Sequence, residues 1–387
     1  MAKKTRTRKK ADDGGALPEA GPSLTPVAIP LSSVLGQRRA VDTLDATLAS
    51  GRVHHAWIFH GPSGVGKMTA ALAFAAVLLD PSASPDLAGV VRPDPDSEVQ
   101  RLLKAGTHPD LHVVVKELAR FSDDRQVRER KLRFIPLEVI KEHLLQPAAL
   151  AAQMAGGGAS KVFVVDEAHL LNAATQNALL KTLEEPPEGT VIIMVTNAED
   201  RLLPTIRSRS QRVAFGTLDD EAMRAWVGSR EELASADPDE LGWLMRFAEG
   251  APGRLLAAAK AGTSRWHREL SPLMDMTDRG VFSPALGPAM ATLVEERAKA
   301  LVEGDKQASK DAANKTALDE MLSLVASRYR TALRSASGRA DEVAIGRFLA
   351  ALDAVERTRR EAQGSVQAKF ALDHLASTLA SGEAVAI

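Results

Sequence analysis

A glycine-rich segment in the first quarter of the chain constrains the fold most strongly. Residues 61–67, Gly-Pro-Ser-Gly-Val-Gly-Lys, follow the apolar run Trp57–Phe59 and precede a stretch with helical character. Lys67 would neutralise the β and γ groups of a nucleotide, and three glycines would let backbone N–H groups surround its phosphates: Gly61, Gly64 and Gly66. The pattern therefore predicts a phosphate-binding loop after a buried strand.

The residue after the lysine departs from the usual form of this loop. A Ser or Thr normally stands there because its hydroxyl ligates Mg²⁺, but this chain has Met68, with Thr69 one place too late. A helix turns about 100° per residue, so Thr69 points elsewhere, and a thioether is a poor ligand for a hard cation. ATP remains a candidate ligand through the loop residues, Thr69 included in that set, whereas the Mg²⁺ site is impaired. We expect weak or absent ATPase activity.

Three further apolar runs have the character of buried parallel strands. They lie at 112–115, 162–165 and 191–195, separated by helical or loop patterns. Continuous apolar runs that alternate with helices are typical of a parallel sheet buried on both faces. The sequence therefore predicts an α/β core over residues 31–215, preceded by a disordered basic leader at residues 1–30.

Composition excludes several function classes. The 387 residues include no cysteine, which excludes disulfides, a thiol nucleophile, iron–sulfur clusters and cysteine-built zinc sites. No apolar run of about 18 residues appears, and the basic N-terminus lacks an apolar segment, so we expect no membrane span, no signal peptide and a cytoplasmic location. The ten Phe, four Trp and one Tyr are not interleaved with basic residues, which disfavours a base-stacking surface.

Strand character stops after Phe215. Thr217 with Asp220 resembles a capping box, and the Gly-Ala-Pro-Gly loop at 250–253 opens another helix, so we expect a small helical domain at 216–262. Residues 263–387 carry apolar side chains at helical spacing and should form an all-helical third domain. Periodicity leaves open whether these helices form a bundle or an oligomerisation surface.

Two carboxylates end the apolar run at 162–165. Asp166 would hold Mg²⁺ through water, and Glu167 would polarise the attacking water. Taken alone, acidic residues at a strand end are more often helix N-caps, but the upstream phosphate loop favours the nucleotide role. Residues 166–169 read Asp-Glu-Ala-His, as in one class of helicase, yet no second RecA-like domain is present to support a helicase.

Several segments together resemble the bacterial clamp loader, a set of AAA+ subunits within the DNA polymerase III holoenzyme. They are residues 34–37, 177–186 (Asn-Ala-Leu-Leu-Lys-Thr-Leu-Glu-Glu-Pro) and 203–210, and the resemblance covers about residues 31–255. It implies a P-loop NTPase core, a helical lid and a C-terminal helical collar. Residues 106–111 resemble the delta-prime subunits rather than the gamma/tau motor subunits.

The resemblance also implies three site residues. Asn197 matches the first sensor position, where a polar side chain would meet the γ-phosphate or the attacking water; its alternative is a turn residue. Arg209 matches the arginine finger that reaches a neighbouring subunit's ATP, and its alternative is a surface arginine. Arg254 matches the second sensor on the lid.

This chain departs from the family in its metal ligands. The family's four-cysteine zinc module falls on residues 80–105, which contain no cysteine, so we expect no zinc and a loop over 81–100. His108 and His112 lack partners at finger spacing and should be ordinary loop and strand residues. Ser210 replaces the cysteine beside Arg209. The charged stretch 120–133 suggests a solvated loop or hairpin, with DNA contact as an outside alternative.

The sequence therefore favours a delta-prime type of subunit that helps load the sliding clamp onto primer–template DNA. Its partners would be gamma/tau and delta subunits in a hetero-pentamer, with no membrane involved. Whether the chain is itself an enzyme is open. The alternative is an active gamma/tau-type ATPase motor, which Lys67, Asp166 and Glu167 favour and Met68 disfavours.

Overall fold

The computed structural model describes most of the chain. The described residues are 30–122, 124–128, 134–234, 236–304, 310–362 and 367–381. The leader expected at residues 1–30 lies outside them except for its last residue.

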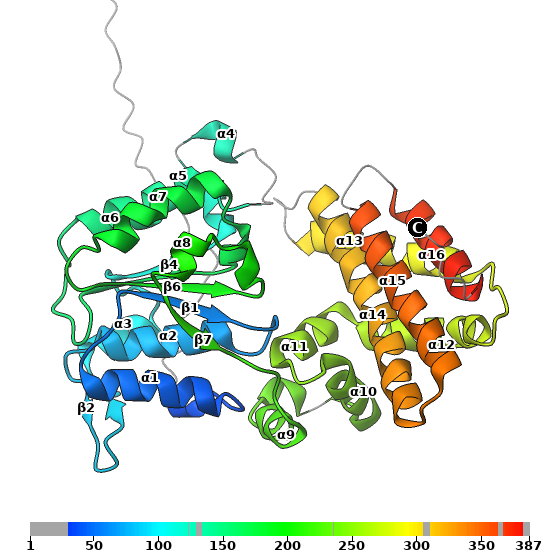
Figure 1. Ribbon diagram of the computed structural model, residues 1–387, viewed down its shortest axis with the longest axis horizontal. Coiled ribbons are helices and arrows are strands. Elements are labelled where there is room, and N and C mark those ends of the chain that lie inside the picture. Colours follow the sequence, from blue (N-terminus) through cyan, green and yellow to red (C-terminus); the bar gives the residue numbers. More distant parts are fainter. Residues whose placement is uncertain are drawn as a thin grey trace, which may run out of the picture.

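A five-stranded parallel sheet forms the first part of the molecule (Figure 1). Its strands run in the order β4 (Leu111–Val114), β5 (Lys161–Val165), β6 (Thr190–Thr196), β1 (Ala56–His60) and β7 (Gln211–Ala214). The first four confirm the predicted strands within one or two residues at each end. The fifth strand is an addition that the apolar pattern did not predict.

Helices cover both faces of this sheet because successive side chains of each strand point to opposite sides. Trp57 and Phe59 join the apolar cluster beneath the sheet, whereas Ile58 joins the cluster above it. The lower face is covered by α1 (Arg38–Ser50), α2 (Lys67–Leu78) and α3 (Glu98–Lys104). The upper face is covered by α5 (Leu137–Ile140), α6 (Gln146–Ala149), α7 (Ala173–Glu184) and α8 (Pro204–Arg207).

The segment 81–100 is not simply the loop that we expected. It contains a short hairpin of β2 (Ser84–Pro85) and β3 (Val91–Arg92), and α3 already begins at Glu98. Asp80, fully buried, holds the two ends of this segment together. Its carboxylate accepts hydrogen bonds from Ser82 N at 2.9 Å, Ser82 Oγ at 2.6 Å, Ser97 Oγ at 2.6 Å and Gln100 Nε2 at 2.9 Å.

The charged stretch at 120–133 also differs from the expected loop or hairpin. A 3₁₀ helix (Lys116–Phe121) and α4 (Arg125–Arg128) occupy its described part. DNA contact by this stretch stays a prediction. The two histidines are placed as expected, because His108 lies in a loop and His112 lies in β4, where its ring stacks on Phe163.

Three helices follow the sheet: α9 (Asp220–Gly228), α10 (Pro238–Ala248) and α11 (Pro252–Ala261). The expected capping box of Thr217 and Asp220 is wrong. Asp219 is the N-cap of α9, and its carboxylate accepts a hydrogen bond from Ala222 N at 2.8 Å. Asp219 has the extended backbone that a cap requires, so the helix begins two residues later than a cap at Thr217 would place it.

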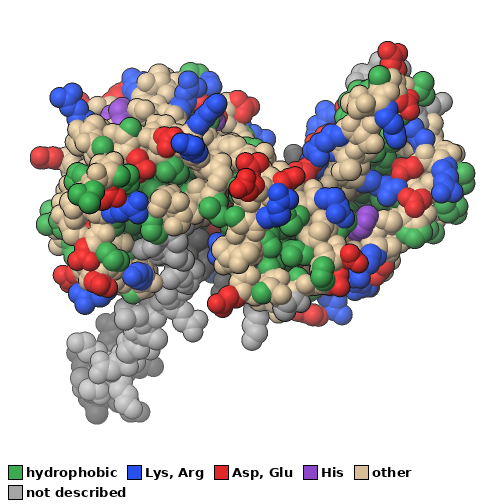
Figure 2. All heavy atoms as spheres, turned by 90° about the horizontal axis from the view of Figure 1, so that it is seen from below, with side chains coloured by type: hydrophobic (Ala, Val, Ile, Leu, Met, Phe, Trp, Pro, Cys, Tyr) green, Lys and Arg blue, Asp and Glu red, His purple; other side chains and the backbone are tan. Residues whose placement is uncertain are grey.

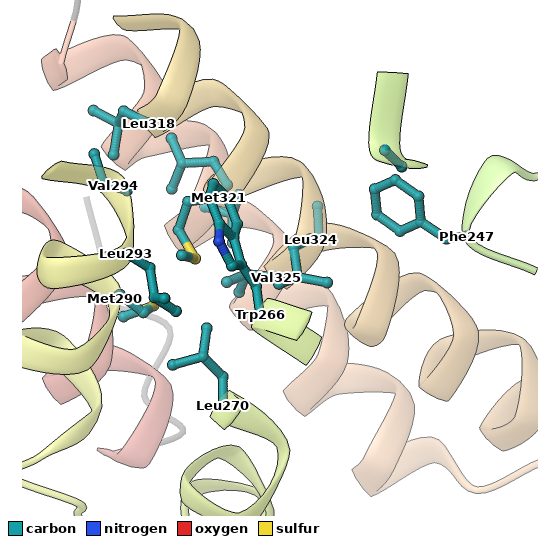
Figure 3. Packing of buried hydrophobic residues seen from close by; sticks show 14 of the residues in the cluster. Phe247, Trp266, Leu270, Met290, Leu293, Val294, Leu318, Met321, Leu324 and Val325 are labelled. Carbon is teal, nitrogen blue, oxygen red and sulfur yellow. The ribbon is translucent and has the colours of Figure 1, made fainter. Parts of the chain in front are cut away.

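Five longer helices complete the chain, as the apolar spacing predicted. They are α12 (Thr263–Asp278), α13 (Leu286–Gly304), α14 (Lys310–Gly338), α15 (Glu342–Ala362) and α16 (Ala368–Ser381). Figure 3 shows Trp266 of α12, Met290 of α13 and Met321 of α14 packed together in their core. One buried apolar cluster continues from Leu218 to Leu379, so these helices share a core with α9 to α11. The domain boundary at residue 262 stays a prediction.

The surface carries charges of both signs. Figure 2 shows basic and acidic side chains interspersed over both parts of the molecule, with a hollow between the sheet part and the C-terminal helices. Within the described residues, no helix is long and apolar enough to cross a membrane.

Candidate functional site

The carboxyl ends of three neighbouring strands gather the candidate site residues at one edge of the sheet. The phosphate loop follows β1, Asp166 and Glu167 follow β5, and Asn197 follows β6. Ligands of open parallel sheets bind at this edge. The sheet therefore brings together residues that are about 140 positions apart in sequence.

The phosphate loop adopts a conformation that requires its glycines. Gly61 has φ 138°, and a Cβ there would lie 2.1 Å from the Phe215 carbonyl oxygen. Gly66 has φ 97° and directly precedes α2, whose first turn offers backbone amides to an anion. Gly64, at φ 78°, touches the helical segment 216–262, which we call the lid. Its carbonyl accepts a hydrogen bond from Gly253 N at 2.8 Å.

Lys67 folds back across its own loop. Its Nζ donates hydrogen bonds to the Gly61 carbonyl at 2.8 Å and to the Pro62 carbonyl at 2.5 Å. Burial lowers the pKa of Lys67 to about 8, although the nearby Asp166 carboxylate favours the charged form. The ammonium therefore satisfies the loop itself and must exchange these partners to meet a phosphate.

Met68 is directed toward the hydrophobic core rather than toward a metal. Its side chain packs against the buried cluster that joins α2 to the lower face of the sheet. Thr69, the next residue, is exposed. In the described residues no group of three or more His, Asp or Glu side chains has a metal-binding arrangement. Whether zinc is absent stays a prediction.

The two carboxylates after β5 have different surroundings. Burial raises the pKa of Asp166, and its Oδ1 accepts a hydrogen bond from Glu167 N at 2.8 Å. Glu167 has a left-handed backbone with φ 47°, and its Oε2 lies 2.7 Å from Lys116 Nζ. Lys116 follows β4, the strand beside β5. The Glu167 carboxylate is already occupied by the Lys116 ammonium, which would have to move away before Glu167 could polarise a water.

Asn197 directly follows β6 and is exposed. The neighbouring Thr196 is buried, and its hydroxyl lies 3.4 Å from His169 Nδ1 and accepts a hydrogen bond from Ala198 N at 3.1 Å. These contacts hold the end of β6, so the position of Asn197 at the site edge is set by its buried neighbour.

Arg209 follows α8 and is partly exposed, with 37% of its side chain accessible. Its Nη2 pairs with Glu184 Oε1 at 2.7 Å, and its Nη1 donates a hydrogen bond to the Thr205 carbonyl at 3.1 Å. Glu184 is the last residue of α7. The guanidinium is therefore oriented at the surface by contacts from two helices.

Arg254 lies in the first turn of α11. Its Nη1 pairs with Glu249 Oε2 at 2.7 Å, and its guanidinium lies 4.5 Å from the centre of the Phe247 ring. Burial lowers the pKa of Arg254, and the Glu249 carboxylate opposes this shift. The side chain is thus engaged within the lid rather than with the phosphate loop.

Comparisons with known proteins show which proteins this chain resembles. The family model described as DNA polymerase III, delta subunit matches residues 36–219. The DNA polymerase III subunit delta' of Pseudomonas aeruginosa is 34% identical over 202 residues, which cover 51% of this chain and 53% of that protein. Over about half of its length, the chain is therefore similar to the bacterial clamp-loader subunits of DNA polymerase III.

Relatives of both subunit types, delta' and gamma/tau, match this chain. The DNA polymerase III subunit gamma/tau of Mycobacterium tuberculosis is 29% identical over 274 residues, which cover 66% of this chain and 42% of that protein. The chain thus spans about half the length, or less, of these two relatives. A solved gamma subunit-related protein from Thermotoga maritima is 17% identical to this chain, with a TM-score of 0.40. The match covers 88% of this chain and 98% of that protein.

Three charged partners at the site were not predicted from the sequence: Lys116, Glu184 and Glu249. Each lies far from its partner in sequence or in a turn without a motif. Lys116 had a usable signal, because it directly follows an apolar run and must share the sheet edge with Glu167 if the two strands are neighbours. Glu184 lies inside the segment 177–186, but nothing there indicates that it meets Arg209.

Proposed function

We propose that this chain is the delta-prime subunit of a bacterial clamp loader. In this role it joins gamma/tau and delta subunits in a cytoplasmic hetero-pentamer that loads the sliding clamp onto primer–template DNA. It completes a neighbour's ATP site through Arg209 and hydrolyses little ATP itself. The C-terminal helices would form its part of the collar.

The observation that carries this proposal is the core-facing Met68. Mg²⁺ would supply charge neutralisation for hydrolysis of a nucleoside triphosphate, and the hydroxyl that would hold it in this loop type is replaced by the thioether of Met68. The ion pair of Lys116 with Glu167 removes a second requirement, because the carboxylate is already engaged. Both features support a subunit with little turnover of its own.

The residues at the loop nevertheless fit the phosphates of ATP. Its polyphosphate would be held by the amides of the first turn of α2, by the loop glycines and by Lys67. Bound ATP would place its negatively charged phosphates in this loop. Asp166 remains at the sheet edge, but burial raises its pKa and so disfavours the charged carboxylate.

Arg209 supports a role in trans because it lies at the surface and is already oriented. A guanidinium stays charged and binds phosphate oxygens with two parallel donors. Fingers of this kind contribute about 10³–10⁵ to the rate of the site they complete.

The test is a reconstituted clamp loader that contains either wild-type chain or an Arg209→Ala variant. We expect the site that Arg209 completes to lose about 10³-fold or more of its turnover, so clamp- and DNA-stimulated ATPase falls by the share of that site. The matched control is Arg212→Ala, since Arg212 is also partly exposed and paired with a glutamate, Glu199. Equal activity of the Arg209 and Arg212 variants would refute the trans role.

Arg254 favours a second candidate, the active gamma/tau-type motor. A lid arginine beside the loop is of use to a subunit that senses its own nucleotide. In that case a Lys67→Ala chain would abolish a large part of the loader's ATPase, while Arg209→Ala would matter less. The proposed delta-prime role predicts that Lys67→Ala has little effect.

A further inference from the structure

Glu249 is the centre of a charge cluster that joins the lid to the C-terminal helices. It follows α10 with a left-handed backbone, φ 49°, and only 15% of its side chain is exposed. The carboxylate pairs with Arg254 of the lid at 2.7 Å and with Arg330 of α14 at 3.1 Å, and it also pairs with Arg334. One carboxylate is therefore shared by three guanidinium groups.

The cluster lies directly beside the phosphate loop. A cavity of about 350 Å³ is lined by Ser63 of the loop together with Glu249, Arg254 and Arg330. Ser63 and Arg254 also line a second cavity of about 400 Å³. Residues of the phosphate loop and of the charge cluster therefore line the same cavities.

The backbone brings the same two parts into contact. Gly253 N donates its hydrogen bond to the Gly64 carbonyl, and a Cβ on Gly64 would lie 2.9 Å from Arg254 N. Arg254 Nη2 is buried without a hydrogen-bond partner. This unused donor belongs to a half-buried side chain, one residue from the loop contact of Gly253, and is a suitable partner for a phosphate oxygen.

We propose that Glu249 is an internal competitor for nucleotide phosphate. Its carboxylate holds Arg254 on the lid and fastens the lid to α14, and a nucleotide in the loop must replace Glu249 as the anion that Arg254 binds. This latch lowers the affinity of the resting chain for nucleotide and links loop occupancy to the contact between the lid and α14. The inference rests on the proposed nucleotide loop, and it is independent of Arg209.

The latch predicts that removing the charge of Glu249 strengthens nucleotide binding, whereas a purely structural role predicts weaker binding. Glu249→Gln keeps the size of the side chain but removes the competing charge, so Arg254 is released for the phosphate. A charge-assisted hydrogen bond no longer has to be exchanged, and we expect binding to tighten about tenfold. Loss of a merely structural residue would loosen the lid and weaken binding.

The test is calorimetric titration of the full-length chain with ATPγS, a slowly hydrolysed ATP analogue. We expect Glu249→Gln to bind about tenfold more tightly than wild type, and Glu249→Gln with Arg254→Ala to lose that gain. The matched control is Glu232→Gln, an exposed lid glutamate, which should leave affinity unchanged. Arg330→Gln with Arg334→Gln should give no gain, because Glu249 then remains paired with Arg254 alone.

Affinity that is unchanged or weaker in folded Glu249→Gln would overturn the latch, as would an equal gain in the double variant. If Glu249→Gln fails to fold, amide hydrogen exchange of the wild-type chain tests the proposal instead. Saturating ATPγS should then increase exchange in residues 249–254, the turn between α10 and α11, and unchanged or decreased exchange would overturn the proposal. A failed latch leaves the loader ATPase test of Arg209 untouched, so the two failures are distinguishable.

Discussion

Replacement of Asp80 by alanine should destabilise the sheet part of the molecule strongly, although Asp80 lies outside the nucleotide loop. Its carboxylate is fully buried and accepts four hydrogen bonds that close the segment 81–100. In the Asp80→Ala variant, water can replace the partner of the exposed Ser82, but Ser97 and the buried Gln100 lose an ionised acceptor.

The expected magnitude follows from those two bonds. Hydrogen bonds to a charged group are worth about 1.5–3 kcal/mol each, and Gln100 keeps one bond to the Ala76 carbonyl. We therefore expect a loss of about 3–4 kcal/mol in the free energy of unfolding. For a domain of this size, 1 kcal/mol moves the melting temperature by about 2–4 °C, so the shift should be about 6–16 °C.

Differential scanning calorimetry measures this shift, and Asp86→Ala is the matched control. Asp86 lies in the same hairpin and accepts bonds from Ala88 N, Val90 N and Arg92, but it is exposed to water and should matter less. Similar shifts for both variants would refute the reasoning.

The pH dependence of the Asp80→Ala effect gives a second check. Burial alone would raise the pKa of Asp80, but hydrogen bonds from Ser82, Ser97 and Gln100 lower it overall. A depressed pKa stabilises the fold above the unfolded value of about 3.9, and that stability is lost as the pH falls through the folded pKa. The gap between wild type and Asp80→Ala should therefore shrink in strong acid.

Three further predictions concern ligands of the loop and the missing metal. Met68→Thr should restore a hydroxyl for Mg²⁺ and make ATPγS binding tighter with Mg²⁺ than with a chelator; calorimetry checks this, and a gain equal in both buffers would contradict it. Nucleotide affinity of the wild-type chain should fall as the pH rises through about 8, because the Lys67 ammonium, whose pKa is about 8, loses its charge; a flat profile from pH 7 to pH 9 would argue against Lys67 as a phosphate ligand. Elemental analysis of purified protein should find no stoichiometric zinc, and about one zinc per chain would show that ligands other than cysteine hold it.

The sheet was predictable to the extent that its strands are buried. β1, β5 and β6 are buried over nearly all residues and appear as continuous apolar runs. β7 lies at the sheet edge and buries only Val213 of its four residues, so its sequence carries no such run. An edge strand is specified by pairing with β1 rather than by its own apolar content.

The candidate site was predictable where a motif fixes the backbone, and not where side chains meet across the fold. The loop glycines, Asp166 and Arg209 follow from spacing and context. The partners that decide how these residues act come from elsewhere: Lys116 reaches Glu167 from another strand, and Glu184 reaches Arg209 from another helix. Such ion pairs depend on the sheet order and helix packing, which no local pattern encodes.

The shared core of the lid and the C-terminal helices has a mechanical consequence. Since one apolar cluster runs from Leu218 to Leu379 and Glu249 fastens the same parts together, the helices after residue 217 should move as a single rigid arm. This arm meets the phosphate loop at the hydrogen bond between Gly253 N and the Gly64 carbonyl. A displacement of α14 should therefore be passed on to the phosphate loop through this contact.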